Sequence, residues 1–193
     1  MLSNAKHLTT ALAFCCLLLS GCSSIITATT SEPIRPDPTT RTFGFYIDDE
    51  NIETIARVNL NKAHPALKGA NISVVSFNGI VLLTGQVSDQ QMRQLASDTV
   101  LKLHRVRQVF NELEIGKETT IWSESNDALI TSNIKTQLLF KRGIKSSRIK
   151  VITENGVVYL MGIMPKIQAE KAASVASMSS GVRRVVKAVE YID

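Results

Sequence analysis

The chain repeats one short stretch, which reads NGIVLLTG at residues 78–85 and NGVVYLMG at residues 155–162. The two copies start 77 residues apart (155 − 78). Asn-Gly favours the type I′ turn of a two-residue hairpin, because both positions of that turn need a positive φ. The apolar, β-branched run after each turn is typical of a strand buried on at least one face. Each stretch therefore predicts a β-hairpin whose second strand ends near a glycine.

The residues around the first copy predict a helix, two hairpin strands, a second helix and a third strand. Ile52, Ala56 and Leu60 recur at the spacing of one helical face, behind acidic residues 48–50 that suit a helix N-terminus. Residues 88–91 have the pattern of a capping box with Ser at the N-cap, which opens the second helix. The buried stripe of that helix is either Met92, Ala96 and Val100 or Leu95, Thr99 and Leu103. The expected strands are residues 72–76, 80–86 and 106–115.

The same order recurs around the second copy. Ser125 or Asn126 is expected to cap a helix that runs to about Phe140, and Pro165 suits the first turn of a second helix. The plan is thus duplicated, which predicts two small domains. In each, a three-stranded mixed sheet with two helices on one face is the natural two-layer solution, an α+β fold of order αββαβ. The expected core stripes are Ile130, Ile134 and Leu138, and Ala169, Ala172, Ala173 and Ala176; the expected strands are residues 148–154, 157–163 and 182–192.

The N-terminus predicts a lipoprotein signal peptide over residues 1–21. Its apolar run, residues 8–19, is shorter than the roughly 20 residues that span a bilayer. The run leads into Leu-Ser-Gly-Cys, which resembles the bacterial lipobox and places acylation at Cys22. The alternative is an ordinary secretory cleavage site with a chance cysteine. By resemblance to Gram-negative lipoproteins, Ser23 after the cysteine implies sorting to the outer membrane.

Residues 22–46 are expected to form a lipid-anchored, flexible linker. Ser, Thr and Pro dominate this segment, and such a composition cannot bury a core. Its end carries an apolar cluster that either packs on the first domain or contacts a membrane or a partner. The members of this cluster are Phe43, Phe45, Tyr46 and Ile47.

The combination of motifs resembles BON domains. Each hairpin stretch is followed by a helix and then by Val-x-x-Val, at residues 106–109 and 182–185. The whole chain is similar to the dual-BON-domain outer-membrane lipoproteins of the DolP (YraP) family. The resemblance implies BON domain 1 over residues 47–116 and BON domain 2 over residues 117–193.

One position departs from the family pattern. The glycine that precedes Val-x-x-Val is Gly181 in the second copy, whereas Arg105 stands there in the first. The turn from helix to strand is therefore expected to differ in the first domain.

The sequence nominates no catalytic centre, no metal site and no cofactor. The motifs of metalloproteases, P-loops and serine hydrolases are missing, and a nucleophile, base or metal in a cleft is what an enzyme needs. Acidic residues 48–50 are interpreted as a solvated helix start rather than a metal cluster. His104, Arg105 and Arg107 are interpreted as exposed residues near a strand start rather than an anion site. We therefore expect a protein that is not an enzyme.

The positive charge is concentrated in the second copy. Residues 47–117 carry 8 Lys and Arg against 8 Asp and Glu, whereas residues 123–193 carry 11 against 6. Helical periodicity places Leu129 and Phe140 together, away from the core stripe, and cations lie on or just beyond the same helix. Exposed apolar residues beside cations are what an interfacial helix presents to anionic lipid. The alternative is that Leu129 and Phe140 pack against the first domain and that the cations form a solvated face.

The resemblance implies that this helix contacts anionic phospholipid, notably phosphatidylglycerol. The expected contact residues are Trp122, Leu129, Lys135, Phe140, Lys141, Arg142 and Lys145. The family also implies a lipid anchor on the periplasmic face of the outer membrane and a role in envelope integrity. The alternative function is a periplasmic adaptor for proteins of outer-membrane assembly or cell division. Although the pI is near 9.2, export makes nucleic acid an improbable partner.

Overall fold

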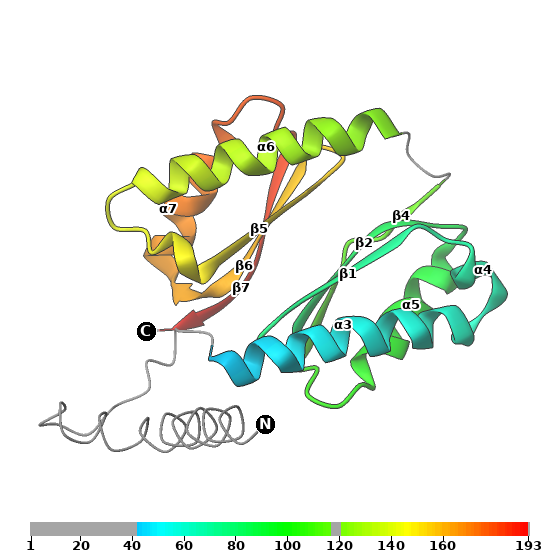
Figure 1. Cartoon of the computed structure of the whole chain (residues 1–193). Coiled ribbons are helices and arrows are strands. Elements are labelled where there is room, and N and C mark those ends of the chain that lie inside the picture. The colour runs from blue at the N-terminus through cyan, green and yellow to red at the C-terminus, as the bar shows by residue number, and fades with distance from the viewer. Residues whose placement is uncertain (1–41, 117–120, 193) are drawn as a thin grey trace, which may run out of the picture. The chain divides into compact units, whose positions relative to one another are not determined.

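The computed structural model describes residues 42–116 and 121–192, and of residues 121–124 it describes only the backbone. The predicted order of elements occurs twice (Figure 1). The signal peptide, Cys22 and most of the expected linker lie outside the described residues. The first repeat comprises α3 (Phe43–Ala63), the short α4 (Pro65–Lys68), β1 (Ile72–Phe77), β2 (Ile80–Val87), α5 (Gln90–Leu101), β3 (Gln108–Asn111) and β4 (Glu114–Ile115). The second comprises α6 (Ile121–Phe140), the single turn η1 (Ser146–Arg148), β5 (Ile149–Glu154), β6 (Val157–Pro165), α7 (Lys166–Ser177) and β7 (Arg184–Ile192).

Each repeat forms a mixed sheet, as predicted. β1 pairs with β2, and β5 with β6, as antiparallel hairpins closed by Asn-Gly turns. The third strand of each repeat follows a helix and pairs in parallel with the middle strand. In the first repeat this strand is split into β3 and β4, which keep one register along β2. The strand orders β1-β2-β3 and β5-β6-β7 leave β1 and β5 as outer strands.

Each sheet buries one face against the helices of its own repeat. In the first repeat, α3 contributes Ile52, Ala56 and Leu60, as predicted. Of the two stripes considered for α5, the structure selects the one formed by Met92, Ala96 and Val100. In the second repeat, the core contains Ile130, Ile134 and Leu138 of α6 together with Ala172, Val175 and Ala176 of α7.

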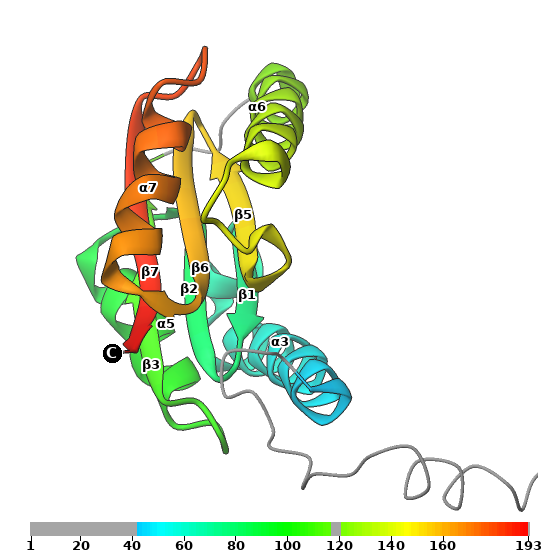
Figure 2. The same ribbon diagram turned by 90° about the vertical axis from the view of Figure 1, so that its left-hand side faces the viewer.

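The other faces of the two sheets bury one another. Phe77, Ile80 and Leu82 of the first repeat share a hydrophobic cluster with Tyr159 and Met161 of the second. Figures 1 and 2 show the two sheets facing each other, with the helices on the outer sides. Because both faces of β2 and β6 are covered, these strands read as continuous apolar runs rather than alternating ones.

Two reciprocal ion pairs border this interface. Arg107, near the start of the third strand in the first repeat, donates through Nη1 to Glu190 Oε1 at 3.1 Å. Arg184, at the start of β7, donates through Nη2 to Glu112 Oε2 at 3.0 Å. Each pair thus joins an arginine of one repeat to a glutamate of the other. Both pairs are partly exposed, so we expect them to set the register of the interface more than its stability.

Tyr159 gives this interface a pH dependence. Burial raises the pKa of its phenol from 10.0 to about 12, with the nearby charge of Glu112 adding to the effect. A raised folded-state pKa means that the stabilisation is complete below pH 10 and is lost as the pH rises through 12. We expect the free energy of unfolding to fall by about 2–3 kcal/mol over this range, measured by urea denaturation. The Tyr159→Phe variant should lack this component of the decline; a decline of the same size in both proteins would contradict the assignment.

Three helix starts differ from the prediction. α3 begins at Phe43 with Thr42 as N-cap, so residues 43–46, assigned to the linker, are helical. Asp89 rather than Ser88 caps α5, because its carboxylate accepts from Met92 N–H at 2.9 Å. α6 already begins at Ile121, so neither Ser125 nor Asn126 is its cap. The apolar residues at the start of α3 are not packed away, since Phe43 is 79% exposed.

The expected departure at Arg105 is absent. Arg105 has a φ of 69° and Gly181 a φ of 86°, so both turns use the same left-handed backbone. That conformation costs a residue with a side chain on the order of 1 kcal/mol. Arg105 also forms an ion pair with Asp48 of α3. The absence of a glycine at position 105 predicted a different turn, but the structure has the same turn in both repeats.

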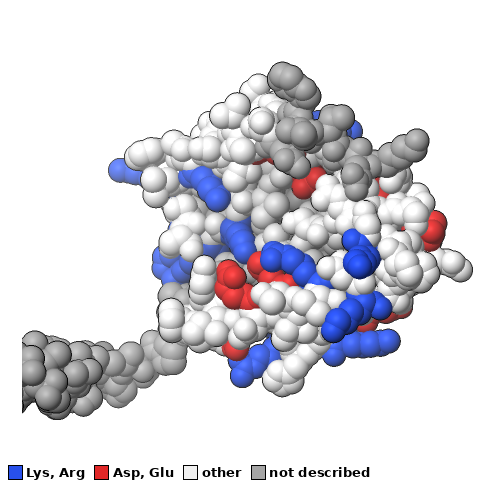
Figure 3. Space-filling view, turned by 45° about the vertical axis from the view of Figure 1, so that its right-hand side comes forward, with Lys and Arg blue, Asp and Glu red and all other residues white. Residues whose placement is uncertain are grey.

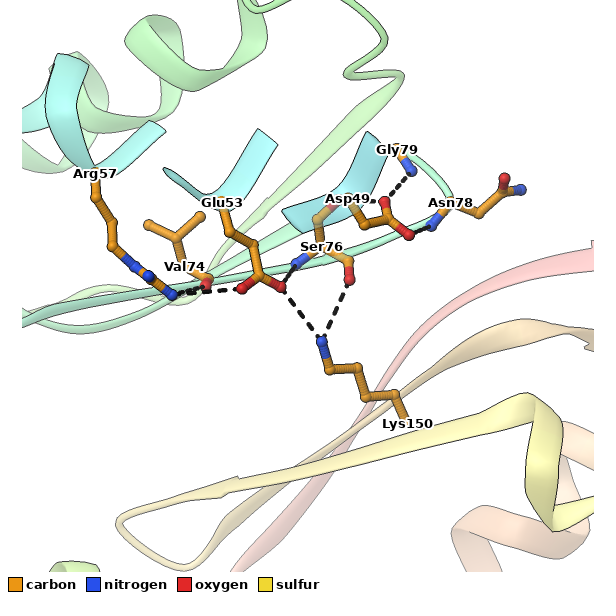
Figure 4. Close-up of polar contacts among 8 residues, drawn as sticks. All are labelled: Asp49, Glu53, Arg57, Val74, Ser76, Asn78, Gly79 and Lys150. Atoms are coloured by element: carbon orange, nitrogen blue, oxygen red, sulfur yellow. Dashed lines mark hydrogen bonds and ion pairs between the residues drawn. The ribbon is translucent and has the colours of Figure 1, made fainter. Parts of the chain in front are cut away.

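A buried carboxylate holds each Asn-Gly turn against the first helix of its repeat. Asp49 of α3 accepts from Ser76 Oγ at 2.6 Å, Asn78 N–H at 2.8 Å and Gly79 N–H at 3.0 Å (Figure 4). Its side chain is buried, so the interpretation of residues 48–50 as a solvated helix start is wrong for Asp49. Asp127 of α6 does the same in the second repeat. Its carboxylate accepts from Asn155 N–H at 2.6 Å and Gly156 N–H at 2.8 Å.

Candidate functional site

The outward side of α6 exposes three large apolar side chains. Leu129 is 71% exposed, Leu139 65% and Phe140 80%. At about 100° per residue, Leu129 and Phe140 lie within about 20° of each other around the helix, opposite the core stripe. The alternative that these two residues pack against the first repeat is therefore wrong. Sequence reasoning missed Leu139, which extends the apolar side.

Cations cluster where α6 ends. Lys141, Arg142 and Lys145 are exposed, and within the described residues none of them forms an ion pair. Gly143 turns the chain with a φ of 81°, and a Cβ at this position would lie 3.4 Å from Nζ of Lys171. Lys171 of α7 thus adds a fourth cation that the sequence did not indicate. Figure 3 shows basic side chains at the left of that view, over the end of α6 and the loop that follows it.

The other two expected contact residues are Lys135 and Trp122. Lys135 lies about 120° from Leu129 but about 40° from Leu139 around the helix, and it lines a groove between α6 and β5 whose second hollow also includes Leu139. Trp122 falls inside α6, two turns before Leu129, but its side chain lies outside the described residues. The outer face of α6 is therefore defined as Leu129, Leu139 and Phe140 with Lys141, Arg142, Lys145 and Lys171.

The described residues form none of the other sites considered from the sequence. Among residues 42–116 and 121–192, no group of three or more His, Cys, Asp or Glu side chains is placed to hold a metal ion. No helix in the same ranges is long and apolar enough to cross a bilayer. Arg105 and Arg107 already engage Asp48 and Glu190, so the anion site considered for them is not formed.

Comparison with known proteins matches residues 48–117 and 126–193 to the BON domain. The chain belongs to the BON-domain family. The first match runs from residue 48 within α3 past the end of β4, and the second runs from residue 126 within α6 past the end of β7. The family resemblance and the α+β fold drawn from the sequence are thus confirmed.

Three relatives are similar over most of their length. The chain is 32% identical to "Outer membrane lipoprotein DolP" of Haemophilus influenzae, over 92% of each chain. It is 35% identical to "21 kDa hemolysin" of Actinobacillus pleuropneumoniae, over 84% of this chain and 81% of that protein. It is 29% identical to "Osmotically-inducible protein Y" of Escherichia coli, over 78% of this chain and 76% of that protein.

Proposed function

We propose that this protein is a non-enzymatic lipoprotein of the outer membrane, anchored by acylated Cys22, whose BON domain 2 binds anionic phospholipid through the outer face of α6. The observation that carries the proposal is the exposed apolar side of α6, which ends in a cluster of cations that form no ion pair within the described part of the chain. The name of the Haemophilus influenzae relative supports the location, and the lipobox-like stretch supports the anchor. The role that follows is support of envelope integrity.

The energetics favour a composite contact. Burying a leucine or phenylalanine side chain contributes about 1.5–3 kcal/mol, and each cation near an anionic surface about 1 kcal/mol. Phe140 inserted among acyl chains would leave Lys141 and Arg142 at the level of the phosphates. Cations at a helix C-terminus also stabilise the helix by themselves, so structural and lipid-binding roles have to be separated by experiment.

The proposal is tested by vesicle co-sedimentation of the chain from residue 22 with Cys22→Ser, which removes the acyl chains. We expect binding to phosphatidylglycerol-containing vesicles and weak binding to purely zwitterionic ones. Because exposed charges are screened with a Debye length of about 10 Å at 0.1 M salt, the binding should weaken as salt is added. Equal binding to both vesicle types would defeat the claim of anionic lipid recognition.

The second candidate function is an adaptor that binds a protein through the same apolar side. The exposure of Leu139 and Phe140 favours it as much as it favours lipid. A photo-crosslinking residue in place of Phe140 separates the two in cells. A lipid adduct supports phospholipid binding, whereas a protein adduct supports the adaptor.

A further inference from the structure

The outer strands β1 and β5 differ in whether side chains cover the backbone groups of their free edges. The residue pair next to the turn is Phe77–Ile80 in the first hairpin and Glu154–Val157 in the second. The pair that flanks a two-residue turn is hydrogen-bonded, and hydrogen-bonded and non-hydrogen-bonded pairs alternate along an antiparallel ladder. The N–H and C=O groups of Val74 and Ser76, and those of Val151 and Thr153, therefore point away from their partner strands.

Side chains cover the free edge of β1 (Figure 4). Glu53 of α3 accepts from Ser76 N–H at 2.9 Å, and Arg57 Nη2 lies 3.5 Å from Val74 O. Lys150 of BON domain 2 donates to Ser76 O at 3.4 Å and to Glu53 at 3.3 Å. An exposed edge invites another strand, and side chains on it are one of the ways in which proteins prevent this.

The equivalent edge of β5 lacks this cover. Thr131 and Lys135 occupy the positions of Glu53 and Arg57, 78 residues later, as Asp127 does for Asp49. Thr131 bonds the hydroxyl of Thr153 at 2.7 Å instead of its backbone. Among the described residues, no side chain forms a hydrogen bond with the outward backbone groups of Val151 or Thr153.

A groove runs along this open edge. A hollow of about 540 Å³ between α6 and β5 adjoins a second of about 420 Å³, and the two share Lys135 and Val151. The hollows extend from Glu154 to Ile149, which is the length of β5. Lys135 stands midway, is exposed and has no ion pair within the described residues. The two carboxylates at the turn end of the groove belong to Asp127 and Glu154. Asp127 accepts hydrogen bonds from the Asn155–Gly156 turn.

We propose that BON domain 2 binds an extended peptide segment of a partner protein, which adds to β5 as a further strand and places an acidic side chain against Lys135. Main-chain bonds to Val151 and Thr153 would supply the affinity, as in other cases of strand addition, and Lys135 would supply the charge preference. Lys135 lies about 120° around α6 from Leu129, whereas Leu139 of the outer face lines one end of the groove. The inference rests on the edge of β5 and on Lys135, and it does not depend on the lipid proposal.

The test uses the chain from residue 22 with Cys22→Ser and three blocked peptides of about seven alternating Thr and Val residues. One peptide has a central Glu and the second a central Lys. The third has the central Glu between two prolines, which remove the pairing N–H groups. Binding is measured by NMR shifts and hydrogen exchange. We expect the Glu peptide to bind at least about tenfold more tightly than the other two and to protect the amides of Val151 and Thr153.

Two variants make the test specific. Thr131→Glu with Lys135→Arg installs at β5 the cover that β1 has, and should reduce binding of the Glu peptide at least about tenfold without lowering the melting temperature. Thr99→Glu with Lys102→Arg, the same changes on and just after α5, should leave binding unchanged. Lys135→Glu should reverse the preference in favour of the Lys peptide.

Three results would overturn the proposal. The first is the absence of shifts at Val151 and Thr153 with every peptide at about 1 mM, a concentration that detects even weak binding. The second is binding that survives Thr131→Glu with Lys135→Arg. The third is protection of the β5 amides that grows with protein concentration alone, which would assign the edge to a second copy of the chain.

Discussion

Replacing Asp49 with alanine is expected to destabilise BON domain 1 by about 3–5 kcal/mol. The substitution removes the acceptor of two backbone N–H groups and of Ser76 Oγ, all held within 3.0 Å. Hydrogen bonds to a charged group contribute about 1.5–3 kcal/mol each, and buried donors left without an acceptor add a penalty. The loss should appear in urea denaturation as a lower midpoint, since the surface exposed on unfolding hardly changes.

Matched variants separate this effect from a general loss of charge. Glu50→Ala removes an exposed carboxylate at the next position of α3 and should change stability by less than about 0.5 kcal/mol. Asp127→Ala should cost BON domain 2 about 2–4 kcal/mol, because two backbone donors rather than three donors lose their acceptor. Equal, small effects of Asp49→Ala and Glu50→Ala would show that the carboxylate does not hold the turn.

Reversing Lys141 and Arg142 to glutamate is expected to weaken binding to anionic vesicles by about 30- to 1,000-fold, or about 2–4 kcal/mol. Each cation near the surface contributes about 1 kcal/mol, and each introduced carboxylate repels the same phosphates. The charges also sit beyond the C-terminus of α6, so the reversal will lower stability somewhat. Circular dichroism at the temperature of the binding assay should show that the variant remains folded.

The control for this variant has the same change in net charge. Lys62→Glu with Lys68→Glu alters two exposed lysines of BON domain 1, neither of which forms an ion pair within the described part of the chain. Its vesicle binding should stay within about threefold of the parent protein if contact is local to α6. A similar loss in both double variants would indicate attraction by overall charge rather than by this face.

Local periodicity was sufficient to predict much of the fold from the sequence. The Asn-Gly turns fixed both hairpin positions, and the spacing of Ile130, Ile134 and Leu138 predicted the buried side of α6, because both signals lie within a few residues. Helix starts were predicted less well. Ser88 was predicted to cap α5, whereas the structure places Asp89 at the N-cap.

The residues that join distant elements were missed for a physical reason. Asp49 looks like any acidic residue near a helix start, and its partners lie 27–30 residues away. One signal was available in retrospect, because Asp49 and Asp127 recur at nearly the same interval as the turns that they bind. The contrast between Glu53 and Thr131 was equally visible, but its meaning required the hairpin register and the side chains at each edge.

At the candidate site, the sequence predicted the exposed Leu129 and Phe140 and the cations after them. It grouped Lys135 with them, but helix position alone does not show what lies beside a helix. In the structure, β5 lies beside Lys135 and forms the groove there. Lys171 was missed because it comes from α7 and meets the end of α6 only in the folded chain.

The most direct measurement is an NMR titration of the isotopically labelled chain, without acyl groups, using phosphatidylglycerol-containing and purely zwitterionic bicelles. If the outer face of α6 recognises anionic phospholipid, amide shifts will concentrate at residues 139–145 and around Leu129 with the anionic bicelles and will be small with the zwitterionic ones. Shifts centred on BON domain 1, or of equal size with both bicelles, would contradict it.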